Sequence, residues 1–276
     1  MAATRYHSRG WAEIIADGAL KLTAALWFLT AVAGQLVFAF YISGFYGRTA
    51  AAGNFAAWDK HLIHGIVDGD LIGNIAVAAH LLMAFVITIG GPIQLIPQIR
   101  AYAPTFHHWN GRIYLLTAVA ISIGGLYMVW TRGVIGGFPA YLGISLNAIL
   151  IMFFAAQAVR YAIARDISTH RRWALRLYLA VSGVWFIRVG LMAWIIVNQG
   201  PLGNTKDFDG PFDSFIVFAS YLVPLAILEI YFRTQDRAGA GGKLAMAGAL
   251  AGLTALMGLG VFGAYNIMWL PRLMSV

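Results

Sequence analysis

Long apolar runs alternate with short polar segments along the chain. Each run has about the 20 residues that an α-helix needs to cross the hydrocarbon core of a bilayer, or somewhat more. The pattern therefore predicts an all-α fold, a polytopic membrane helix bundle with seven transmembrane helices in a single domain, residues 1–276. The predicted spans are residues 19–43, 72–97, 113–131, 139–161, 174–198, 214–232 and 244–270.

Two segments outside the spans have their own periodicity. Residues 1–18 place Trp11 and other apolar residues at helical spacing beside two arginines, which predicts an interfacial N-terminal helix. Residues 44–71 form a predicted extracytoplasmic loop in which Phe55 and Trp58 share one face of an amphipathic helix. We expect this helix to lie on the membrane surface.

The last span, residues 244–270, follows a Gly/Ala-rich link at residues 238–242. It carries Gly248-x-x-x-Gly252, a pattern that lets two helices approach closely and that also arises by chance in Gly/Ala-rich helices. The membrane lipid is one predicted partner. Self-association through the spans and association with other membrane subunits both remain open.

Two basic segments, residues 99–114 and 159–178, resemble each other. In each, an Arg ends the preceding apolar run, a His and a Trp lie in a predicted loop, and Arg-x-Tyr begins the next run. We interpret them as a weak internal repeat of a helical hairpin, formed by the second and third spans and again by the fourth and fifth. The repeated residues are His107, Trp109, Arg112 and Tyr114 in the first segment and His170, Trp173, Arg176 and Tyr178 in the second.

Composition and charge fit a membrane protein. The chain is 60% hydrophobic and 11% charged, whereas charged residues make up about a quarter of an average soluble domain. Its net charge of +8 does not indicate nucleic-acid binding, because the basic residues lie mostly between apolar runs rather than in one patch. There is no Cys, which excludes disulfides, thiolate metal sites and Cys catalysis.

The distribution of Lys and Arg predicts the orientation. Thirteen lie in the N-terminal segment and in or beside the loops on its side of the membrane, and five lie on the other side. Because cytoplasmic loops are enriched in basic residues, the N-terminus is predicted to be cytoplasmic and the C-terminus periplasmic.

Polar side chains inside the spans form a predicted layer in the outer half of the membrane. At roughly 1.5 Å per residue, His80, Asn147 and Arg188 lie at similar depths. Arg188 has no acidic residue near its own level, so it needs carbonyl groups, water or an anionic ligand. A ligand pocket and a purely structural network both explain the layer. Three more polar residues fall at similar depths: Gln35, Ser122 and Ser220.

His107 and His170 are the candidate ligands at the opposite, cytoplasmic end. Each precedes a span that runs outward, so we expect the two rings to lie at matching depth and close together. Such a pair is able to ligate a metal or a haem iron, with arginines on the haem propionates. The alternative is an ordinary positive-inside loop whose His and Trp side chains lie among headgroups. The surrounding arginines are Arg112, Arg171, Arg172 and Arg176.

Several spaced motifs stand out in the middle of the chain. They are Gly91-Pro92-Ile93-Gln94, His107-His108-Trp109-Asn110-Gly111-Arg112, His170-Arg171-Arg172-Trp173 and Trp185-Phe186-Ile187-Arg188. These motifs resemble the bacterial membrane-protein family catalogued as domain of unknown function 2306. The resemblance covers residues 68–232 and departs from the family pattern at His108, where that pattern has Arg. It implies a bacterial inner-membrane protein and brings no established activity.

Two functions from different classes follow from these residues. The leading hypothesis is a membrane redox protein that binds b-type haem or a quinone between its helices. The alternative is a non-enzymatic binding or transport protein for a small polar or anionic solute, or an accessory subunit of a larger membrane complex. The sequence does not decide whether the protein is an enzyme.

The first prediction concerns orientation. A reporter that is active only in the cytoplasm, fused within residues 162–169, should be active, because this loop carries bases of the cytoplasmic set. A fusion within residues 200–210 is the matched control and should be inactive. The reverse pattern of activities would show that the orientation is wrong.

Overall fold

The computed structural model describes residues 10–62 and 65–275, which are helical for most of their length and contain no strand. Six helices in this part of the chain are long and apolar enough to cross a membrane, and a bent helix pair provides a seventh crossing. The all-α, polytopic bundle is thereby confirmed. The crossing elements are α1 (Trp11–Tyr41), α3 (Leu71–Leu95), α5 (Pro104–Arg132), α6 (Gly137–Ile163), α7 (Ile167–Val181) with α8 (Gly183–Val197), α9 (Pro211–Arg237) and α10 (Ala240–Gly263).

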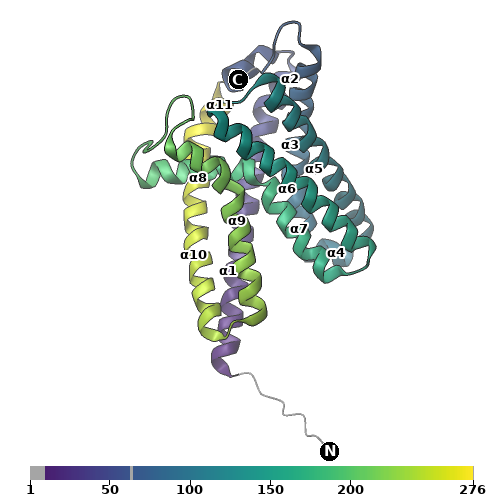
Figure 1. The fold of residues 1–276 in the computed structure, drawn as a ribbon, viewed down its shortest axis with the longest axis vertical. Helices are drawn as coiled ribbons and strands as arrows, with labels where there is room; N and C mark the ends of the chain where they lie inside the picture. The colour runs from purple at the N-terminus through teal and green to yellow at the C-terminus, as the bar shows by residue number, and fades with distance from the viewer. Residues whose placement is uncertain (1–9, 63–64, 276) are drawn as a thin grey trace, which may run out of the picture.

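The helices form two groups that meet near the end of the bundle that holds the C-terminus (Figure 1). α1 packs along α10 with α9 beside them, while α3 packs along α5 and α6 along α7. The start of α1 and the short helix α11 lie at opposite ends of the bundle, which we call the N-terminal end and the C-terminal end. The shorter elements are η1 (Ile42–Gly47), α2 (Arg48–Ala51), η2 (Phe55–Lys60), α4 (Pro97–Tyr102), η3 (Ala264–Trp269) and α11 (Leu270–Met274).

The first membrane helix is longer at both ends than its apolar run. α1 is continuous from Trp11, so the separate interfacial helix predicted for residues 1–18 is wrong over residues 10–18, and residues 1–9 lie outside the described residues. No Pro interrupts this stretch, and Gly18 meets no neighbour that would force a bend. The helix also continues beyond Tyr41 through η1 and α2 to Ala51.

The predicted loop at residues 44–71 therefore begins later than expected. Its expected amphipathic helix is the six-residue 3₁₀ helix η2, and Trp58 turns into the protein rather than toward the membrane surface. The Trp58 indole N–H donates to Thr49 Oγ1 at 2.8 Å, and this bond fixes η2 against the end of the first helix. Phe55 stays exposed.

The two basic segments are helical rather than loops. Pro104 begins α5, and Asp166 caps α7 by accepting a 3.1 Å hydrogen bond from the Thr169 N–H. Pro at the first helical position and Asp at the N-cap are both strong helix-start signals. His107 and His170 consequently stand in the first turn of α5 and of α7, at the N-terminal end.

The fifth predicted span, residues 174–198, is broken. α7 and α8 meet at Ser182 with a bend of 56°. Ser182 Oγ donates to the Tyr178 carbonyl at 2.8 Å, and Gln35 Nε2 on α1 donates to Ser182 Oγ at 2.9 Å. Carbonyls in the last turn of a helix lack intrahelical partners, and Asn147 Nδ2 on α6 donates to one of them, Ala180 O, at 3.1 Å. These bonds allow the break inside the membrane.

Close helix contacts in α10 involve other glycines than the predicted pair. Gly248 and Gly252 have no atom of the described residues within 4 Å of the place where a Cβ would lie. A Cβ on Gly260, by contrast, would collide with the Val189 carbonyl oxygen and lie 2.7 Å from Val189 Cγ1. Gly260 therefore allows α10 to touch α8.

The second prediction follows from this contact. Gly260→Ala should lower the melting temperature of the purified protein, because α8 has to move away from α10. Gly252→Ala is the matched control and should leave it unchanged or raise it, since Ala favours a helix over Gly by about 1 kcal/mol. Equal effects of the two substitutions in a thermal melt would contradict the role of Gly260.

An ion pair joins α3 to α5 at the C-terminal end. Arg132 Nε and Nη2 lie 2.9 and 2.8 Å from Asp70 Oδ2, and Arg132 Nη2 also donates to Asn74 Oδ1 at 2.7 Å. Asp70 additionally caps α3 through the Gly73 N–H at 2.9 Å. Hydrogen bonds from Gly73 and Arg132 hold the pKa of the Asp70 carboxyl below its ordinary value.

The third prediction concerns the pH dependence of this pair. Because the folded-state pKa is lowered, the stabilisation is present above the ordinary carboxyl pKa and is lost as the pH falls through the folded value. Asp70→Asn keeps a capping oxygen but removes the charge, so it should lower the melting temperature at neutral pH. Thermal melts at decreasing pH should show wild type and variant converging. A constant difference at every pH would contradict a charge effect.

Candidate functional site

At the N-terminal end, His107 belongs to a polar cluster between α3 and α5. Asn110 Nδ2 donates to Gln94 Oε1 at 2.8 Å and to Gly90 O at 3.0 Å. This orients the Gln94 amide so that its NH₂ group lies 3.3 Å from His107 Nε2, which accepts. The His107 Nδ1 is buried without a partner among the described residues. His107 Nε2 is therefore already engaged within the protein.

His170 has a different environment on α7. Its Nδ1 lies 2.8 Å from the Ala158 carbonyl, which only accepts, so Nδ1 donates. His170 thus contacts α6, whereas His107 contacts Gln94 on α3. Their proposed role as metal ligands stays a prediction. Over the described ranges, no group of three or more His, Asp or Glu side chains is placed to hold a metal ion.

The arginines of the basic segments differ in their partners. Arg176 forms two hydrogen bonds with Glu229 on α9, at 2.6 and 3.0 Å, and Arg172 forms two with Asp236 at 2.6 and 2.8 Å. The Arg176 pair is bidentate, with Nε and Nη2 each donating to one Glu229 oxygen, whereas Arg172 contacts both Asp236 oxygens through Nη2 alone. They join α7 to α9 and neutralise two of the charges that were predicted to meet haem propionates.

The remaining arginines of that set are exposed. Arg112 lies over the Trp109 ring, with its Cζ atom 5.1 Å from the ring centroid, and Arg171 lies on the surface of α7. Exposed Arg and Trp side chains at the end of a bundle are typical of a membrane interface. This arrangement fits the alternative that the sequence left open for these segments.

The residues of the predicted polar layer contact different parts of the protein. Asn147 faces Ala180 and Gly183 at the break between α7 and α8. Arg188 turns toward α1: it donates to the Val184 carbonyl at 2.6 Å and lies 5.4 Å from the centroid of the Phe38 ring. His80, on α3, has a buried Nδ1 without a partner among the described residues.

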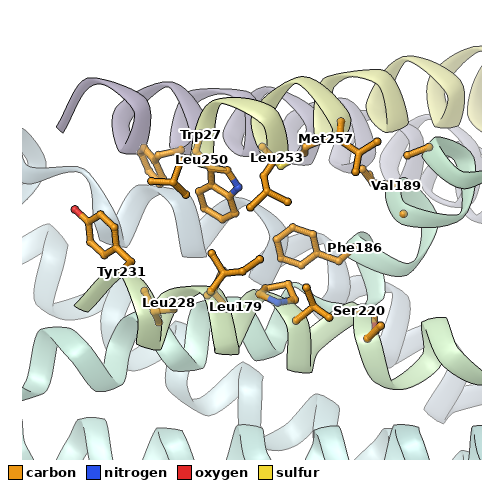
Figure 2. A pocket seen from close by; sticks show the side chains of 18 of the residues that line it. Trp27, Leu179, Phe186, Val189, Ser220, Leu228, Tyr231, Leu250, Leu253 and Met257 are labelled. Atoms are coloured by element: carbon orange, nitrogen blue, oxygen red, sulfur yellow. The ribbon is translucent and has the colours of Figure 1, made fainter. Parts of the chain in front are cut away.

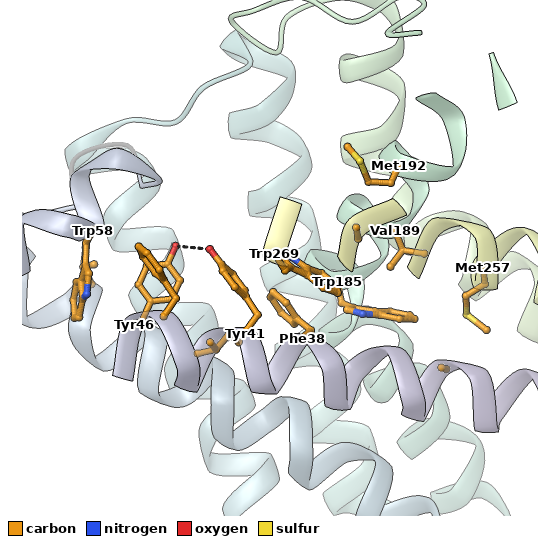
Figure 3. Packing of buried hydrophobic residues seen from close by; sticks show 14 residues of the cluster. Phe38, Tyr41, Tyr46, Trp58, Trp185, Val189, Met192, Met257 and Trp269 are labelled. Carbon is orange, nitrogen blue, oxygen red and sulfur yellow. Dashed lines mark hydrogen bonds between the residues drawn. The ribbon is translucent and has the colours of Figure 1, made fainter. Parts of the chain in front are cut away.

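Sequence reasoning missed an aromatic cluster next to Arg188. Around Phe38 lie Tyr41 and Trp269, with ring centroids 6.3 and 5.2 Å away, and the Tyr41 hydroxyl lies 3.4 Å from that of Tyr46 (Figure 3). Phe38, Tyr41 and Phe45 recur at helical spacing in the sequence, which is the signal that was available. This spacing did not single out the cluster, because aromatic residues at helical spacing also occur on the buried face of an ordinary helix.

The structure also contains a large apolar groove that no sequence motif indicated. It has a volume of about 810 Å³ and lies between α1 and α10 on one side and α7, α8 and α9 on the other (Figure 2). Two of its aromatic side chains, Trp27 and Phe186, stack with ring centroids 6.2 Å apart. Further lining residues include Leu179, Leu228, Tyr231 and Leu253.

One polar group reaches the groove from the core. Tyr178 lines it, and the Tyr178 hydroxyl donates to Gln35 Oε1 at 2.9 Å. Gln35 in turn donates to Ser182, so the wall of the groove is tied to the break between α7 and α8. This wall of the groove is therefore formed by α1, α7 and α8, which are distant from one another in the sequence or separated by the break.

Comparison with known proteins places the chain in a family. Residues 77–231 match the family described as "Predicted membrane protein (DUF2306)". No curated protein and no solved structure matches the chain. The matched stretch includes the polar cluster at His107, the broken helix pair and Arg188. Since it covers more than half of the chain, the protein belongs to this family of membrane proteins.

Proposed function

We propose that the protein binds an isoprenoid quinone in the apolar groove as part of a bacterial inner-membrane redox system. The observation that carries the proposal is the groove itself, with its volume of about 810 Å³ and its almost wholly apolar wall. Small-molecule sites in proteins commonly measure about 300–1,000 Å³ and place a few polar groups in an apolar lining.

The length of the groove fits a long apolar tail. Phe212 and Tyr231, both on α9, line its two ends, and they are nineteen residues apart in the sequence. At about 1.5 Å per residue this separation is roughly 28 Å, close to the thickness of the hydrocarbon core. An extended isoprenoid chain that lies parallel to α9 would fill such a groove and displace lipid from it.

The aromatic and hydroxyl groups fit a quinone ring. Trp27 and Phe186 offer flat faces, and stacked aromatic pairs add about 0.5–1.5 kcal/mol beyond their buried area. Quinone carbonyls accept hydrogen bonds, and the hydroxyls of Tyr178 and Tyr231 on the wall are able to donate them. The Tyr178 hydroxyl would exchange its bond to Gln35 for one to the ligand.

The environments of the two histidines favour a quinone over haem. Ligation of haem iron by His107 Nε2 would break its contact with the Gln94 amide. His170 has a free Nε2, but Arg172 and Arg176 beside it are paired with carboxylates and offer little charge to propionates. In the orientation that we propose, this basic end faces the cytoplasm.

The fourth prediction tests the groove. Organic extracts of the protein, purified in mild detergent, should contain about one quinone per chain by ultraviolet absorption and mass spectrometry. Leu253→Trp fills the middle of the groove and should weaken binding roughly tenfold or more, because overpacking costs about 1–3 kcal/mol. Leu244→Trp, on the same helix outside the groove, is the matched control and should retain the quinone.

Two results would contradict the proposal. One is a purified protein that carries only phospholipid and does not take up added quinone. The other is equal loss of quinone from the Leu253 and Leu244 variants. A Soret band in the visible spectrum of the protein would instead favour haem.

A further inference from the structure

Two arginines without carboxylate partners converge near the C-terminal end. Arg188 lies over Phe38 and donates to the carbonyl of Val184 in its own helix. Arg272 on α11 donates through Nη1 to the Tyr41 hydroxyl at 3.2 Å. Within the described ranges neither arginine has an Asp or Glu within salt-bridge distance. The two rings that they contact, Phe38 and Tyr41, have centroids 6.3 Å apart.

The surroundings of these arginines supply hydrogen-bond donors but few acceptors. Trp185 and Trp269 are almost fully buried, and neither indole N–H has a partner among the described residues. Both pack on α1, Trp269 against Phe38 and Trp185 against Gly34. An indole N–H only donates, and a buried polar group without a partner costs about 1–3 kcal/mol. The cluster therefore lacks acceptors and negative charge.

The backbone around the cluster is also unusual. Tyr46 belongs to the π-helical segment η1, and Trp269 belongs to a second π-helical segment, η3. The ends of both segments contact α11, which carries Arg272. π-helical turns are rare and occur frequently at functional sites, since they redirect side chains relative to a regular helix. Here two π-helical segments, η1 and η3, lie beside the arginine cluster.

We infer that this cluster is a binding site for a phosphate-type oxyanion, held by Arg188 and Arg272 with help from Tyr41 and Tyr46. A buried cation is costly unless an opposite charge or polar groups meet it. One anion between two guanidinium groups supplies negative charge and acceptor oxygens. Guanidinium groups bind phosphate oxygens in pairs, and tyrosine hydroxyls donate to the oxygens that remain.

The site is distinct from the quinone groove. Phe186, Gly190 and Ala193 on α8 line the groove together with Trp27 on α1, whereas Arg188 lies over Phe38, which is not a lining residue. The oxyanion has two possible sources: inorganic phosphate from the solution at the C-terminal end, or the headgroup of an anionic phospholipid in the adjacent leaflet. Both present the same chemistry to the arginines.

Thermal melts with two probes test the inference. Delipidated protein is titrated with sodium phosphate against sodium chloride at equal ionic strength, and separately with micelles of phosphatidylglycerol against phosphatidylcholine. The melting temperature should rise by about 5–10 °C in one series once the probe exceeds its Kd about 100-fold. A rise with phosphate identifies the free ion, and a rise with phosphatidylglycerol alone identifies the lipid.

Matched variants assign the effect to the cluster. Arg188→Met and Arg272→Gln should each abolish the rise, whereas Arg160→Met, which removes an exposed arginine at the other end of the bundle, should keep it. If Arg188→Met does not fold, Arg272→Gln decides the outcome. No rise with either probe in the wild type, or the same rise in the cluster variants, would overturn the inference. Quinone content measured on the same samples reports separately on the groove.

Discussion

The need to satisfy backbone groups inside a bilayer governs this structure, and the junction of Gln35, Tyr178 and Ser182 is where it matters most. A helix that breaks within a membrane exposes carbonyl and N–H groups that lipid is unable to bond. Here the Ser182 hydroxyl donates to the Tyr178 carbonyl of α7, and Asn147 donates to the Ala180 carbonyl from the neighbouring helix α6. Gln35 donates to Ser182 and so joins the junction to α1. The bend of 56° between α7 and α8 depends on these bonds.

That bend accounts for both candidate sites. It turns α8 away from the direction of α7, so that Phe186 and Gly190 line the groove while Arg188 lies over Phe38 on α1. Trp185 packs against Gly34 on α1, and Gly260 lets α10 approach Val189 closely. Both candidate sites therefore depend on the position of one short helix, α8.

Arginines have different kinds of partner at the two ends of the bundle. At the N-terminal end, Arg172 and Arg176 meet Asp236 and Glu229 across the α7 and α9 interface, so the charges there join helices. Near the C-terminal end, Arg188 and Arg272 meet aromatic rings and hydroxyls. A paired arginine is explained by the fold. Arg188 and Arg272 lack a carboxylate partner among the described residues, and this is the feature that the proposed oxyanion would satisfy.

The sequence by itself determined the medium, the fold class and the residues that stand out. Apolar length and composition predicted a membrane helix bundle, and the spaced motifs around His107, His170 and Arg188 identified the family that the comparison confirmed. No acidic residue was expected at the depth of Arg188, and Glu229 on α9 pairs with Arg176 instead. Each of these features depends only on the order and spacing of residues along the chain, so it can be read without knowing how the helices pack.

Tertiary structure decided what those residues meet. Equal depth suggested that Asn147 and Arg188 share a pocket, yet rotation about each helix axis turns them toward different neighbours. The break at Ser182 was hidden because a Ser in an apolar run costs little when another helix supplies its partner, and Gln35 lies 147 positions away in the chain. The groove has no motif at all, since seven helices contribute ordinary apolar residues to it. The depth of a residue in the membrane can be estimated from its position in a span, but the direction in which its side chain points is fixed only when the helices pack.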